Sequence, residues 1–66
     1  MYRDSVAAAK ARNDLARETL EHAQEMRAQY AEGTEDYRLW DETVKEAQER
    51  FNDTQEELMK DLEEAL

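Results

Sequence analysis

Gly33 is the only glycine in a chain of 66 residues that contains no proline. These two residue types interrupt helices most often, so almost the whole chain is free to be helical. Glycine readily adopts the left-handed backbone conformation found just past a helix end, and Thr34 beside it is a good N-cap for a following helix. We therefore predict two helices, about residues 4–31 and about residues 35–65, joined by a turn at Glu32-Gly33-Thr34.

Each half of the chain contains a heptad repeat, in which mostly apolar residues recur at alternating steps of three and four. This spacing keeps one face of a helix turned toward a partner helix. In the first half the repeat falls on Tyr2, Val6, Ala9, Asn13, Ala16, Leu20, Ala23, Arg27 and Tyr30. In the second half it falls on Tyr37, Trp40, Val44, Ala47, Phe51, Thr54, Leu58, Asp61 and Ala65. We call these two rows the seam. They predict an all-α fold in which residues 1–66 form a single antiparallel two-helix coiled-coil hairpin.

Folding the chain back at the turn brings the two rows into register. Small alanines then face larger residues along much of the seam, which lets the helices approach closely. The amide of Asn13 falls opposite the hydroxyl of Thr54. Arg27 falls opposite Trp40, which predicts a cation–π contact. Agreement between spacing and side-chain chemistry at several positions favours the hairpin over a disordered chain.

The charge of the chain restricts its partners. The formal net charge is −9. Residues 1–33 have five basic and six acidic side chains, whereas residues 34–66 have four basic and twelve acidic side chains. Nucleic acid and anionic membranes repel such a chain, so we expect direct binding to neither, and a protein partner with a basic face. No apolar run is long enough to span a membrane, and the N-terminus lacks a signal-peptide core, so we expect a cytoplasmic protein.

Catalytic chemistry has few candidate residues here. The chain has no cysteine, and His22 is its only histidine. Glu18 and Met26 share a helix face with His22, but a metal site would need a second histidine or a converging carboxylate from the facing helix. The many carboxylates lie on a convex surface without a cleft to raise a pKa, and no glycine-rich phosphate loop is present. We predict no catalytic residue, no metal and no cofactor, and hence no enzyme.

Several large apolar residues fall outside the seam. One group, the turn patch, lies on one side of the predicted hairpin and consists of Leu15, His22, Met26 and Leu39. A second group, the end stripe, lies on the opposite side near the chain ends and consists of Met59, Leu62 and Leu66. A two-helix hairpin has no third element to cover them, so we interpret both groups as protein-interface candidates. We expect a second copy to cover one of them, giving a homodimeric four-helix arrangement. A different protein can also serve as the cover, and the two interpretations do not exclude each other.

These features favour a small acidic regulator or inhibitor that binds a surface of a larger protein, as phage-encoded or accessory inhibitors of this size and shape do. One alternative is a structural or oligomerisation coiled-coil element, or a fragment of a larger assembly. Another is a nucleic-acid mimic, in which the acidic outer face of the second helix blocks a DNA-binding protein.

Overall fold

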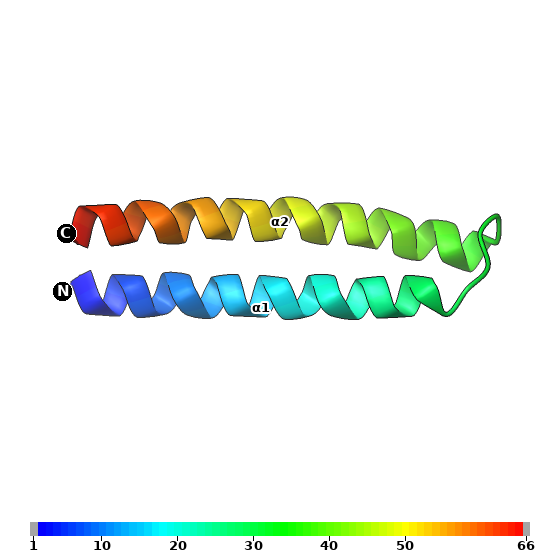
Figure 1. The fold of residues 1–66 in the computed structure, drawn as a ribbon, viewed down its shortest axis with the longest axis horizontal. Helices are drawn as coiled ribbons and strands as arrows, with labels where there is room; N and C mark the ends of the chain where they lie inside the picture. The colour runs from blue at the N-terminus through cyan, green and yellow to red at the C-terminus, as the bar shows by residue number, and fades with distance from the viewer. Residues whose placement is uncertain (1, 66) are drawn as a thin grey trace.

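The computed structural model describes the backbone of residues 2–65 and the side chains of residues 6–64. Helix α1 spans Tyr2–Ala28 and helix α2 spans Glu35–Ala65. The helices lie side by side and run in opposite directions, so both ends of the chain are at the same end of the molecule (Figure 1). The result is a rod whose Cα atoms span 48 × 13 × 11 Å. The predicted all-helical fold of two packed helices is confirmed.

Helix α1 ends earlier than we expected, at Ala28 instead of residue 31. Its last turn is tightened by hydrogen bonds between residues three apart: the Gln29 amide donates to the Met26 carbonyl at 3.1 Å, and the Tyr30 amide to the Arg27 carbonyl at 3.2 Å. Such bonds satisfy carbonyls at a helix end. The connection between the helices therefore comprises residues 29–34, twice the length of the three-residue turn we expected.

Thr34 initiates α2 through its side chain. The Tyr37 amide donates to Thr34 Oγ1 at 3.1 Å, and the same hydroxyl donates to the Ala31 carbonyl at 2.8 Å. The predicted N-cap is thus confirmed, and the hydroxyl also ties the connection to the helix start. Gly33 has a φ of +90°, in the left-handed region that disfavours other residues. It directly precedes this N-cap instead of directly following α1.

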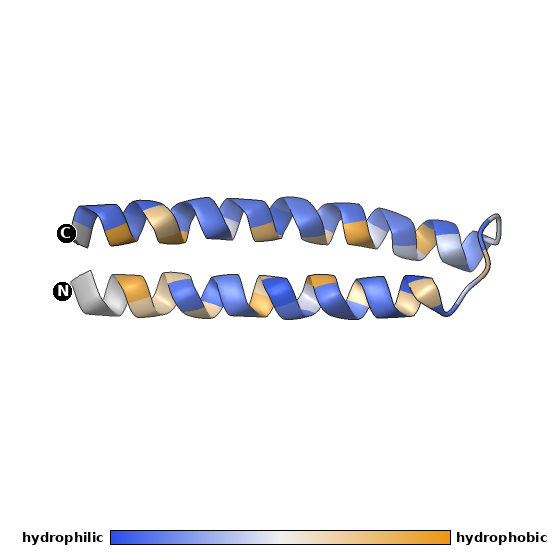
Figure 2. Ribbon diagram, viewed as in Figure 1, coloured by the Kyte–Doolittle hydropathy of each residue, from blue (hydrophilic) through white to orange (hydrophobic). Residues whose placement is uncertain are grey.

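The core of the hairpin is narrow. Among the described side chains, the buried apolar residues are Ala9, Ala16, Leu20, Ala23, Val44 and Ala47. Leu20, Ala23, Val44 and Ala47 form a central cluster, against which the half-buried Trp40 and Phe51 pack. Apolar residues line the facing sides of the helices, whereas the outer surfaces are mostly hydrophilic (Figure 2). All the core residues belong to the predicted seam, and only Leu20 and Val44 are larger than alanine.

Polar groups also connect the helices between the central cluster and the chain ends. Asn13 Nδ2 donates to Thr54 Oγ1 at 3.2 Å, as expected from their facing positions. At the neighbouring flank positions, the Arg12 guanidinium pairs with the Glu57 carboxylate. These contacts join residues more than forty positions apart in the sequence and fix the register of the two helices.

The predicted cation–π contact between Arg27 and Trp40 is wrong. Arg27 Nη1 lies 2.7 Å from Asp41 Oδ1, one residue beyond Trp40. A charge-assisted hydrogen bond to a carboxylate is stronger than a contact with an aromatic face, which explains why Arg27 pairs with Asp41. The ring of Trp40 instead contacts His22, with centroids 6.1 Å apart and an interplanar angle of 83°.

Two leucines on α1 allow the core to be tested with one substitution type. Leu20 is 7% exposed and Leu15 is 64% exposed. We expect Leu20→Ala to lower the free energy of unfolding by about 2–5 kcal/mol, which is enough to unfold most molecules of so small a domain. Leu15→Ala should change it by less than about 0.5 kcal/mol. Urea titration followed by circular dichroism measures both free energies. Equal effects of the two substitutions would contradict the burial of Leu20 and the exposure of Leu15.

The cap at the start of α2 gives a second test. Thr34→Ala removes the acceptor for the Tyr37 amide and should cost about 0.5–2 kcal/mol of stability. Thr34→Ser keeps the hydroxyl and should stay close to the wild-type value. Thermal melts of the three proteins compare them directly. Identical melts for the alanine and serine variants would show that the hydroxyl does not stabilise the helix start.

Candidate functional site

The turn patch is an exposed apolar surface. The exposed fractions of Leu15 and Leu39 are 64% and 54%. Met26 is half-buried and His22 is exposed, with its ring set edge-on against the half-buried Trp40. Trp40 belongs to the seam by heptad position, but this contact also makes it part of the surface around the turn patch.

A small groove lies between the two helices beside Leu15. It has a volume of about 190 Å³. Its lining residues are Arg12, Leu15, Ala16 and Thr19 of α1 and Arg50 and Thr54 of α2. Sequence analysis did not single out Thr19 or Arg50 for this surface. Both occupy the heptad flank position that Arg12 and Glu57 also occupy, and this shared position could have identified them.

The end stripe is exposed to a similar extent. Met59 is 58% exposed and Leu62 is 46% exposed, whereas Leu66 lies outside the described residues. An open depression of about 480 Å³ runs along α2 beside Met59. It is lined by Phe51, Asn52, Gln55, Glu56, Met59, Lys60 and Glu63. The uncovered edge of Phe51 therefore extends the apolar surface of the end stripe toward the middle of α2.

The two patches lie on opposite sides of the hairpin. Heptad positions put Leu15, Met26 and Leu39 on the side where Arg12 pairs with Glu57. They put the end stripe on the side where Arg27 pairs with Asp41. The groove beside Leu15 and the depression beside Met59 accordingly share no residue. No single flat surface can cover both patches, and a symmetric bundle of two hairpins would cover one of them.

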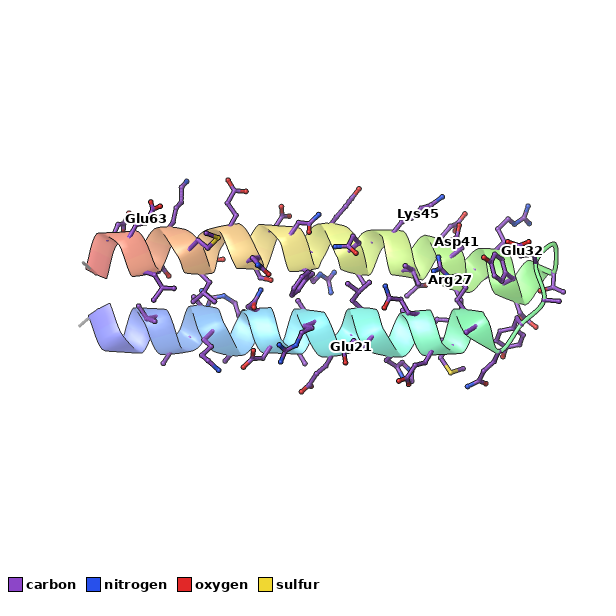
Figure 3. The ribbon with its side chains drawn as sticks, viewed as in Figure 1. Glu21, Arg27, Glu32, Asp41, Lys45 and Glu63 are labelled. Carbon is purple, nitrogen blue, oxygen red and sulfur yellow. The ribbon has the colours of Figure 1, made fainter. Side chains whose placement is uncertain are left out.

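An ion cluster links the helices near the turn. Asp41 accepts from Arg27 at 2.7 Å, and Lys45 Nζ lies 3.4 Å from its other oxygen. Figure 3 shows the Arg27 and Asp41 side chains pointing toward one another between the helices. The hydrogen bond from Arg27 is the main cause that lowers the pKa of Asp41 below its ordinary value of 3.8, and Lys45 adds to it. Ionised Asp41 therefore holds α1 and α2 together at the turn end.

This cluster predicts an acid-sensitive contribution to stability. Because folding lowers the pKa of Asp41, its stabilising effect is fully present above the ordinary value of 3.8 and is lost as the pH falls through the lower folded value. We expect Asp41→Asn to melt below the wild type at pH 7, and the difference to shrink below pH 3.8. Glu42→Gln, an exposed neighbour, is the control. A difference in melting temperature that stays constant from pH 7 to pH 2 would contradict this role.

Within the described part of the chain, no group of three or more histidine, cysteine, aspartate or glutamate side chains is placed to hold a metal ion. Neither helix, over the residues described, is both long enough and apolar enough to cross a membrane. The exposed apolar patches and the charges around them are the features that carry a functional interpretation.

Comparisons with known proteins add no functional information. No family model, curated protein or solved structure matches the chain. The function is therefore inferred from the residues on the two sides of the rod.

Proposed function

We propose that this chain is a non-enzymatic, acidic protein-binding module that regulates or inhibits a larger protein by occupying one of its surfaces. The observation that carries the proposal is the contrast between core and surface. The described core buries two side chains larger than alanine, Leu20 and Val44. Four large apolar side chains are 46–64% exposed, namely Leu15, Leu39, Met59 and Leu62. Such a surface is typical of a protein that completes its packing on a partner.

The energetics favour a partner as well. Full burial of one large apolar side chain contributes about 1.5–3 kcal/mol, and a hairpin of this length is only marginally stable on its own. A partner that covers Leu15 and Leu39, or Met59 and Leu62, stabilises the folded chain because it binds that state alone. Binding and stability are therefore coupled in this molecule.

The partner in this proposal is a protein with a basic face. A net charge of −9 speeds encounter with a positively charged protein and opposes contact with nucleic acid or an anionic membrane. A cytoplasmic setting is part of the proposal. A nucleic-acid mimic would also seek a basic partner, but it would use the charged outer face of α2 and leave the apolar patches unused.

The charge distribution on the side of the rod that carries the end stripe favours the alternative, a structural or oligomerising element. The described flank positions of this side hold the basic residues Lys10, Arg17, Arg38 and Lys45 and the acidic residues Asp14, Glu21 and Asp41. These flank positions balance to within one charge, while Glu56 and Glu63 line the depression beside Met59. We propose that a homodimeric four-helix arrangement, where it forms, uses this side.

The proposed dimer predicts a specific response to substitution. Met59→Gln/Leu62→Gln removes apolar surface without adding charge and should shift the self-association equilibrium toward monomer by about tenfold or more. Leu15→Gln/Leu39→Gln is the matched control on the other side and should leave the equilibrium unchanged. Sedimentation equilibrium at several concentrations measures this, and a wild type that stays monomeric throughout would remove the oligomeric alternative.

The binding function itself is tested by capture from the lysate of the source cell. The wild type and the two double variants are immobilised, and bound proteins are identified at low and at molar salt. We expect a captured protein that is lost from one of the variants and partly retained at high salt, because apolar contacts resist screening. Capture that is identical for all three proteins and vanishes at high salt would instead indicate charge mimicry and contradict the proposal.

A further inference from the structure

Helix α1 carries a second heptad-spaced row beside the seam. Leu15, Thr19, His22 and Met26 follow one another at steps of four, three and four, and none is an aspartate, glutamate, lysine or arginine, which together make up 41% of the chain. Leu39 of α2 and the half-buried Trp40 continue this surface near the turn. A row with an average spacing of 3.5 residues is matched by a helix lying alongside it.

The threonines on this surface do not present unpaired hydroxyls. Thr19 Oγ1 donates to the Leu15 carbonyl at 2.9 Å, and Thr43 Oγ1 donates to the Leu39 carbonyl at 3.1 Å. A hydroxyl bonded within its own helix can be covered by a partner without losing a hydrogen bond. Thr19 and Thr43 therefore add to the surface that an apolar partner can cover.

Acidic residues border this surface on both sides. Glu18 and Glu25 lie along the outer edge of α1, and Asp36 and Glu46 lie along the edge formed by α2. All four are exposed, and none belongs to an ion pair with another described residue. Arg50 supplies positive charge at the end of the surface near Leu15. An occupant with an apolar stripe and basic flanks matches this arrangement.

We propose that the turn patch, with Thr19 and Trp40, is the docking site for a basic amphipathic helix of the target protein. This inference rests on the proposed binding function and names its surface and the chemistry of its ligand. A second copy of the chain is a poor occupant, because it would bring the acidic edges of two chains, each with a net charge of −9, against one another.

The experiment uses the full chain and a synthetic peptide of about three heptads that has leucine at the a and d positions and lysine or arginine elsewhere. Trp40, the only tryptophan, reports binding through its fluorescence, since it contacts His22 within the site. We expect saturable binding that Leu15→Gln/Leu39→Gln weakens by at least about tenfold. Met59→Gln/Leu62→Gln should bind the peptide as the wild type does.

Charge is tested separately. Glu18→Gln/Glu25→Gln should weaken binding and reduce its dependence on salt, whereas Glu49→Gln/Glu56→Gln, with the same spacing on α2, should do neither. A peptide of the same composition in scrambled order, which cannot form an apolar stripe, should bind at least about tenfold more weakly. Equal binding of the scrambled peptide would overturn the docking site and leave only non-specific attraction.

Two further outcomes separate this inference from the proposed function. If peptide binding is absent or insensitive to Leu15→Gln/Leu39→Gln while a protein is still captured through Met59 and Leu62, the docking site is overturned and the binding function stands. If Leu15→Gln/Leu39→Gln abolishes self-association instead, the occupant is a second copy and the inference is likewise overturned. Circular dichroism of each variant confirms that the helices are retained.

Discussion

The close approach of two helices over an alanine-rich seam is the constraint on which this molecule depends. Ala9, Ala16, Ala23 and Ala47 are buried because small side chains let the backbones come together. The same small side chains leave little volume for larger neighbours, so Trp40 and Phe51 are covered on one side only. The groove beside Leu15 and the depression beside Met59 both open at the surface of the rod.

Charge then distinguishes those surfaces. Acidic residues predominate along the outside of α2, while the side that carries Met59 and Leu62 has nearly balanced charge. The turn patch lies on the other side, between two acidic edges. Glu56 and Glu63 line the depression beside Met59, so the end stripe also has acidic neighbours, and the net charge of −9 opposes self-association on either side. In the proposed function, apolar residues supply the affinity for a partner, and the surrounding charges determine which kind of partner can approach.

The fold followed from the sequence to the extent that spacing controls it. Heptad phase assigned Leu20 and Val44 to the seam and Leu15 and Leu39 outside it, and their exposed fractions differ accordingly. Heptad spacing does not predict which of several competing local contacts a residue makes. Where α1 ends depends on a tightened last turn, and the partner of Arg27 depends on whether a carboxylate or an aromatic ring lies within range. The contact of His22 with Trp40 likewise required the actual side-chain directions.

The position of the two patches on opposite sides has a thermodynamic consequence. Under the proposed function, two partners occupy the patches without touching, and this separation alone predicts independent binding. In a marginally stable hairpin this is not so, because each partner binds the folded chain and thereby favours it over the unfolded one. Saturation of one patch at about 100 times its dissociation constant stabilises the fold by about 2.7 kcal/mol. This raises the folded population available to the other patch. Folding alone thus couples the two sides of the rod.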